Sequence, residues 1–165
     1  MRLFIASSAN IEDYSAIRSD FSEVLYGKWV EEENLHLTWS FLGEQKSTDP
    51  WLERLKPIPS MSESTELRSI GFFGHPPRIL YARCESDVLM QKVKEFERQG
   101  FSMKRFRPHV TLCRIKRIED WKGFKELVKK YRGENIGEVL PEIALYESKL
   151  TRAGPIYTKI ENVTT

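Results

Sequence analysis

The sequence of 165 residues predicts one α+β domain. Short apolar runs with the alternation typical of strands recur along the whole chain, and about four segments between them carry apolar residues at helical spacing. A strand-helix-strand unit with the same histidine motif occurs in each half. Because a chain of this length can bury a sizeable core by itself, residues 1–165 are interpreted as a single domain.

Alternating or continuous apolar runs bounded by glycine, proline and polar residues predict the strands. Gly74 to Pro77 is read as a turn between two of them, and His75 within it as a surface histidine. Pro108 is expected near the start of a strand, where the missing backbone donor is tolerated. The expected strands are residues 1–7, 35–42, 65–73, 78–84, 106–115, 136–150 and 156–163.

Start and stop signals predict the helices. Asn10 is expected to cap the first helix and Gly27 to end it. Asp49 followed by Pro50 marks the start of the second, because proline fits the first turn. Ser86 is expected to cap the third, and residues 28–32 are either a polar lead-in to the next strand or a short strand of their own. The expected helices are residues 10–27, 49–57, 86–100 and 121–131.

Composition narrows the function classes. Charged residues make up 30% and apolar residues 40% of the chain, no run approaches the ~20 apolar residues of a membrane helix, and the N-terminus lacks the shape of a signal peptide. We therefore expect a cytoplasmic monomer without a membrane partner. Cys84 and Cys113 form neither a disulfide framework nor a metal-ligand spacing, so no metal or cofactor is expected. Cys113 is better explained as a small apolar filler than as a site residue.

The motif His-x-Thr-x, with apolar residues at x, begins at His36 and again at His109. Each copy lies in a run expected to be a strand, where successive side chains alternate between faces. Each histidine therefore shares a face with its threonine, Thr38 or Thr111, while the apolar residues point to the core. One such copy is typical of a half-buried structural histidine, but two on matching strands favour a paired functional site.

A basic stretch surrounds the second motif. It holds six Lys or Arg residues and no acidic one, with Phe101 and Phe106 beside them. Such a stretch is typical of a surface for a phosphate-bearing, base-stacking ligand, and equally of a solvated strand edge protected against aggregation. The six basic residues are Lys104, Arg105, Arg107, Arg114, Lys116 and Arg117.

The doubled motif resembles the two-histidine phosphoesterase superfamily and, within it, the RNA 2',3'-cyclic phosphodiesterases, also called 2'-5' RNA ligase-like proteins. The matching segments are MRLFIA at 1–6, ENLHLTWSFLGE at 33–44, PHVTLCR at 108–114 and GPIY at 154–157. The resemblance implies a bilobal fold with two pseudo-symmetric lobes of antiparallel strands and helices packed outside. The two His-x-Thr pairs would then face each other across a central cleft.

The resemblance also implies an activity: metal-independent hydrolysis of RNA 2',3'-cyclic phosphate ends to 2'-phosphomonoesters, with reversible 2'-5' ligation as the reverse reaction. By resemblance, His36 is the proton donor to the departing oxygen and His109 the proton acceptor that activates water. Thr38 and Thr111 provide hydroxyl donors beside them. From the residues alone, the acid and base roles of the two histidines stay exchangeable.

Four further residues are candidates for substrate binding. Arg114 matches the family arginine associated with phosphate contact, but strand alternation points it away from His109, so either a bulge turns it back or it is a plain surface arginine. Arg107 has the parity of His109. Phe4 and Tyr157 match family landmarks, and either stack on a base or belong to the core.

Two alternative functions stay open at this point. The chain is either an RNA-end phosphodiesterase or a non-catalytic RNA-binding module that keeps the site without turnover. A relative acting on 2'-5' oligoadenylates or another cyclic phosphate would carry the same site residues. The intact state of both motifs favours the enzyme.

Overall fold

The computed structural model describes residues 1–160. Within them the fold is α+β, as predicted, with nine strands and four α-helices. In chain order the elements are β1 (Arg2–Ile11), α1 (Tyr14–Ser22), β2 (Leu25–Trp29), the 3-10 turn η1 (Glu32–Asn34), β3 (His36–Glu44), α2 (Asp49–Leu55), β4 (Thr65–Phe73), β5 (Ile79–Cys84), α3 (Asp87–Arg98), β6 (His109–Ile118), α4 (Trp121–Lys130), β7 (Asn135–Val139), β8 (Ala144–Thr151) and β9 (Gly154–Ile160).

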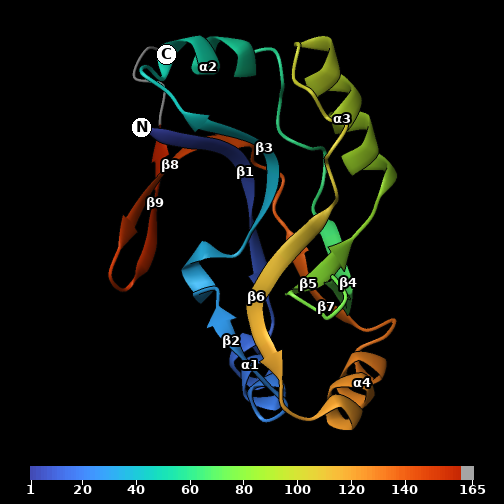
Figure 1. The fold of residues 1–165 in the computed structure, drawn as a ribbon. Coiled ribbons are helices and arrows are strands. Elements are labelled where there is room, and N and C mark those ends of the chain that lie inside the picture. Colours follow the sequence, from blue (N-terminus) through green and yellow to red (C-terminus); the bar gives the residue numbers. More distant parts are fainter. Residues whose placement is uncertain (161–165) are drawn as a thin grey trace.

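The strands pair antiparallel throughout, in the order β2-β6-β5-β4-β7-β1-β8-β9, and β3 connects β1 to β6. Helices α2 and α3 lie at one end of the strands and α1 and α4 at the other (Figure 1). One half is built on β3, β1, β8 and β9, and the other on β6, β5, β4, β7 and β2. Strand β7 pairs with both β4 and β1, so the two halves share one hydrogen-bonded system.

One continuous core holds the halves together. At one end, the rings of Phe21 in α1 and Phe124 in α4 meet edge to face, 6.1 Å apart. At the other, Phe96 of α3 stacks on Trp39 of β3 at 5.2 Å. Helix α3 begins where predicted, because the hydroxyl of Ser86 accepts a hydrogen bond from the Leu89 amide. Helices α1, α3 and α4 each bury apolar side chains against the strands, and α2 packs partly buried apolar residues on the same core. The opposite strand face is left for the polar motif residues.

The first helix was predicted wrongly at both ends. Strand β1 runs through Asn10, so the N-cap position is Asp13, and the helix ends at Ser22. Residues 25–27 of the predicted helix belong instead to β2, which pairs with β6. Gly27 is required by that pairing: a Cβ at this position would lie 2.4 Å from the Arg114 carbonyl oxygen.

The predicted strand 136–150 is two strands, β7 and β8, separated by a segment that contains Pro141. Proline has no backbone donor for a ladder, and its carbonyl accepts instead from the Met61 amide. The predicted end of the last strand, 161–163, lies outside the described residues. His75 is exposed in its turn, as expected. No helix in the described part of the chain is long and apolar enough to cross a membrane.

Candidate active site

The two His-x-Thr motifs meet where β3 touches β6. The contact is a single antiparallel pair, Leu37 with Val110, and both of these side chains are fully buried. Each is the residue between the histidine and the threonine of its motif. The antiparallel register therefore places His36 beside Thr111 and Thr38 beside His109, and all four side chains point to the face opposite the core. We call this surface the site face.

Each histidine ring is fixed in the same way. Nδ1 of His36 lies 2.6 Å from the carbonyl oxygen of Asn34, and Nδ1 of His109 lies 2.6 Å from the carbonyl oxygen of Arg107. Because a backbone carbonyl can only accept, Nδ1 carries the proton in both rings. Nε2 is therefore the nitrogen left to accept or donate a proton on the site face.

The electrostatics of the pair oppose double protonation. Burial lowers the pKa of both histidines from the ordinary 6.5, although the carbonyl hydrogen bonds act in the other direction. The charge of a protonated His109 lowers the pKa of His36 further, and the charge of Arg107 lowers the pKa of His109. An arrangement with one neutral and one protonated imidazole is accordingly favoured over two cations.

An aromatic group supports His36. The Phe4 ring centroid is 5.3 Å from that of His36, and the Tyr157 ring meets His36 edge to face at 5.2 Å. Phe4 is only 5% exposed and also stacks on Tyr146, so it holds the imidazole and offers no open face to a base. Tyr157 is half-buried beside it.

A second aromatic group, absent from the sequence-based candidates, supports His109. Phe73 and Tyr81 meet the imidazole edge to face at 5.2 and 5.7 Å. The guanidinium of Arg107 lies over Phe73, 5.6 Å from its centroid. Strand parity gave a usable signal here, because Tyr81 pairs with Thr111 and therefore shares its face.

A β-bulge decides where Arg114 lies. In the ladder with β5, Tyr81 pairs with Thr111 but the next residue, Leu80, pairs with Cys113, so Leu112 is the extra residue. Leu112 and Cys113 are both buried, and Arg114 emerges exposed on the site face. Its charge opposes the rise in pKa that burial causes at Tyr157, which places the guanidinium near the His36 side of the site.

The first motif has a β-bulge at the same position. Against β1, Thr38 pairs with Ala6 and Ser40 with Ile5, so Trp39 is the extra residue, at the position that Leu112 holds in the second motif. Phe41 is then the counterpart of Arg114 and is 81% exposed. The two halves therefore repeat the backbone while they differ in chemistry, cationic in one and aromatic in the other.

Of two sequence-based interpretations near the second motif, one is wrong and one is confirmed. Phe101 and Phe106 do not accompany the basic residues on the surface: Phe101 is buried against Phe96, and Phe106 stacks on Trp39 at 5.3 Å. Cys113 is fully buried, as expected for an apolar filler, and burial raises the pKa of its thiol to about 12.

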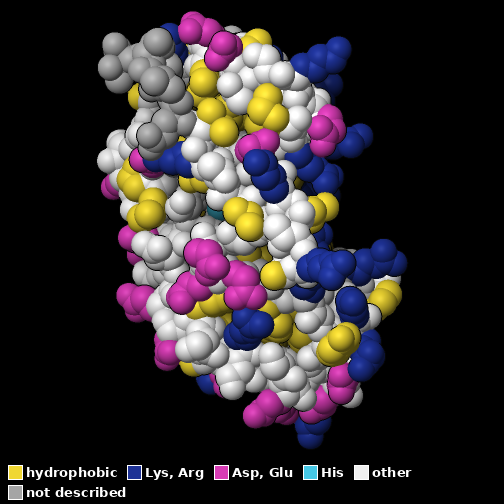
Figure 2. All heavy atoms as spheres, turned by 90° about the vertical axis from the view of Figure 1, so that its left-hand side faces the viewer, with side chains coloured by type: hydrophobic (Ala, Val, Ile, Leu, Met, Phe, Trp, Pro, Cys, Tyr) yellow, Lys and Arg dark blue, Asp and Glu magenta, His cyan; other side chains and the backbone are white. Residues whose placement is uncertain are grey.

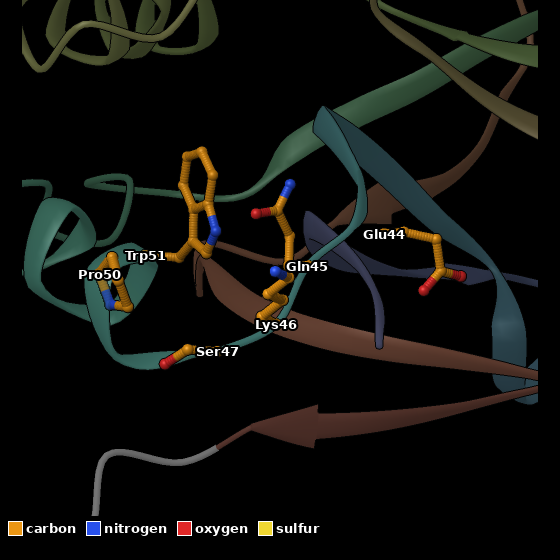
Figure 3. A pocket seen from close by; sticks show the side chains of 6 residues that line it. All are labelled: Glu44, Gln45, Lys46, Ser47, Pro50 and Trp51. Carbon is orange, nitrogen blue, oxygen red and sulfur yellow. The ribbon is translucent and has the colours of Figure 1, made fainter.

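Within residues 1–160, no group of three or more His, Cys, Asp or Glu side chains is placed to hold a metal ion. Figure 3 shows a hollow beside helix α2 that contains none of the motif residues. It is lined by Glu44, Gln45, Lys46, Ser47, Pro50 and Trp51.

Comparison with known families agrees with this geometry. The model of the family described as LigT like Phosphoesterase matches residues 5–81 and 85–157, so that each matched segment contains one His-x-Thr strand. Two relatives named RNA 2',3'-cyclic phosphodiesterase, from Aquifex aeolicus and Methanocaldococcus jannaschii, are each 34% identical to this chain. The alignments cover 96% of this chain and 92% of the first relative, and 98% and 99% for the second.

Solved structures share the fold over nearly the whole chain. TT0787 of Thermus thermophilus is 26% identical with a TM-score of 0.67, and covers 98% of this chain and 96% of its own. E. coli LigT complexed with 3'-AMP is 24% identical with a TM-score of 0.69, over 97% and 95% of the two chains.

Proposed function

This chain belongs to the LigT-like phosphoesterase family, and on that premise we propose that it hydrolyses 2',3'-cyclic phosphate ends of RNA to 2'-phosphomonoesters. The observation that carries the proposal is the pairing of Leu37 with Val110, which sets two imidazoles and two hydroxyls on one face. Relatives with at least 30% identity over almost the full length are named for this activity.

The proposed reaction needs one base, one acid and donors for the phosphate oxygens. Nε2 of His109 takes a proton from water as the water oxygen attacks phosphorus. The bond from phosphorus to O3' breaks, and Nε2–H of His36 gives its proton to O3'. The hydroxyls of Thr38 and Thr111 donate to the two non-bridging oxygens, whose negative charge grows in the transition state. The product carries a 2'-phosphate and a 3'-hydroxyl.

The surroundings of the two rings support this division of roles. The cation of Arg107 favours the neutral form of His109, as a base requires. Both rings have aromatic neighbours, Phe4 and Tyr157 at His36 and Phe73 and Tyr81 at His109, so the cation of Arg107 is the feature that distinguishes them. In the reverse direction, the same two groups would join a cyclic phosphate to a 5'-hydroxyl as a 2'-5' linkage. Water at about 55 M competes with that hydroxyl and favours hydrolysis.

The test is the identity of the product. Pure protein is incubated with a nucleoside 2',3'-cyclic phosphate, and the phosphomonoesters are separated by chromatography. The proposal expects the 2'-monophosphate alone, because the O3' bond is the one that breaks. Formation of the 3'-monophosphate, or no turnover of any cyclic phosphate, contradicts it.

The pH profile of kcat/KM should be bell-shaped with its maximum below pH 6.5. Burial lowers the pKa of both histidines from 6.5. Rising pH generates the neutral base as it passes the pKa of His109, and removes the proton of the acid as it passes the pKa of His36. Removal of the nearby cation in Arg107→Gln should raise the pKa of His109 and move the acidic limb to higher pH. A maximum at or above pH 7.5, or an unmoved limb in the variant, would count against the assigned roles.

Chelation should leave the activity unchanged. The two imidazoles and two hydroxyls supply proton transfer and charge stabilisation by themselves, so the proposed steps assign no task to a metal ion. The rate is measured after dialysis against excess EDTA, and again after addition of Zn²⁺ or Mg²⁺. A rate that falls on dialysis and returns with either ion would overturn the metal-independent scheme.

A further inference from the structure

Two cations face each other at the edge of the sheet, close to the site. Strand β2 is the terminal strand, and its Lys28 pairs directly with Arg114 of β6. Both residues are exposed, and neither takes part in an ion pair between described residues. Like charges directly opposite on one face repel each other. An anion bound between them would remove that repulsion.

This cation pair lies on the site face. Directly paired residues project to the same side, and the bulge at Leu112 has already brought Arg114 to the side of His109 and Thr111. On the site face, the pair of Arg114 and Lys28 therefore lies next to Thr111 in the direction of the sheet edge. A phosphate bound there would be adjacent to the reacting phosphate and distinct from it.

An exposed aromatic residue continues the same face. Tyr26 pairs with Arg117, and the guanidinium lies over its ring, 4.6 Å from the centroid. Lys116 places its ammonium 5.9 Å from the same ring, which is 49% exposed. Cations that alternate with an accessible ring are the usual composition of a surface for single-stranded nucleic acid.

We propose that this surface binds the RNA strand that leads to the cyclic phosphate, and we call it the β2–β6 track. The proposal rests on the proposed function and specifies its substrate as an oligonucleotide end. Lys28 and Arg114 bind the backbone phosphate next to the reacting one, and Tyr26 stacks on a base further from the end. The residues of the track are Tyr26, Lys28, Arg114, Lys116 and Arg117.

Charges of opposite sign are separated on this part of the surface. The turn η1 after β2 carries Glu32 and Glu33, and Glu31 precedes it, so acidic side chains lie beyond the Trp29 end of β2. In Figure 2, Asp and Glu side chains gather in the lower middle of the face, whereas Lys and Arg side chains follow its right-hand edge. A polyanion is repelled from the first region and attracted to the second.

The experiment compares a nucleoside 2',3'-cyclic phosphate with a ten-nucleotide RNA that ends in the same group. Lys28→Gln should lower kcat/KM for the oligonucleotide about tenfold more than for the nucleotide, and Lys28→Arg should restore most of the difference. The salt dependence of oligonucleotide binding should lose a slope of about 0.7, as expected for one single-strand phosphate contact. Lys94→Gln on α3, the same charge change at an exposed residue at the opposite end of the fold from α1 and α4, is the matched control.

Failure of this inference is distinguishable from failure of the proposed function. If the wild-type protein hydrolyses both substrates and Lys28→Gln keeps their ratio and the salt slope, the track is refuted and the activity stands. If neither substrate is hydrolysed, the activity is refuted. Binding of the same RNA with a 3'-phosphate, measured by fluorescence anisotropy, then still decides the track: equal affinity of the wild-type protein and Lys28→Gln would refute it.

Discussion

His36→Ala and His109→Ala should each lower the turnover of a nucleoside 2',3'-cyclic phosphate by about 10²-fold or more. Each substitution removes one of the two Nε2 atoms on the site face. The reaction then lacks either its general acid or its general base. Both side chains are half-buried on the side away from the core, so the packing around Leu37 and Val110 should persist. Initial rates of the purified variants provide the measurement, and circular dichroism verifies the fold.

The chain supplies a matched control in its third histidine. His75 lies exposed in the turn between β4 and β5, and His75→Ala should retain the wild-type rate.

The pH profiles of the residual activity of the two site variants separate the roles of acid and base. His109→Ala should lose the acidic limb, which reports the base, and His36→Ala should lose the basic limb, which reports the acid. Full activity in either site variant would end the two-histidine scheme, while exchanged limbs would reverse the assignment.

The common face of each histidine and its threonine could be predicted from the sequence because alternation in strands is local. His36 with Thr38, and His109 with Thr111, share a face in any regular strand, so only the meeting of the two strands needed the fold. The destination of Arg114 could not be predicted in this way. It depends on the bulge at Leu112, and one extra residue reverses every later side chain in the strand.

The position of Tyr26 and Lys28 on a strand next to the site could not be predicted from the sequence either. Residues 25–27 fall within the predicted first helix, because Val24 and Leu25 continue its apolar spacing. Their assignment to a strand comes from pairing with β6, almost ninety residues further along the chain. Lys28 and Tyr26 thus become neighbours of the site only through a long-range contact, which no local pattern encodes.

Trp39→Ala should lower the free energy of unfolding by about 3–5 kcal/mol, the usual range for truncation of a buried aromatic residue. Trp39 is 2% exposed, and its ring stacks on Phe96 at 5.2 Å and on Phe106 at 5.3 Å. It thereby joins the strand of the first motif to the segment that leads into His109. Urea denaturation measures the loss, and the melting temperature should fall by roughly 6–20 °C.

The conservative variant separates the ring from its hydrogen bond. Nε1 of Trp39 donates to the hydroxyl of Ser7, which is fully buried. Trp39→Phe keeps most of the stacking but leaves that hydroxyl without its donor, at a cost of about 1–3 kcal/mol. A Phe variant as unstable as the Ala variant would assign the stability to the hydrogen bond. A loss below about 1 kcal/mol in Trp39→Ala would mean that the two halves are held together without this ring, by the strand pairing of Leu37 with Val110 and of β7 with β1.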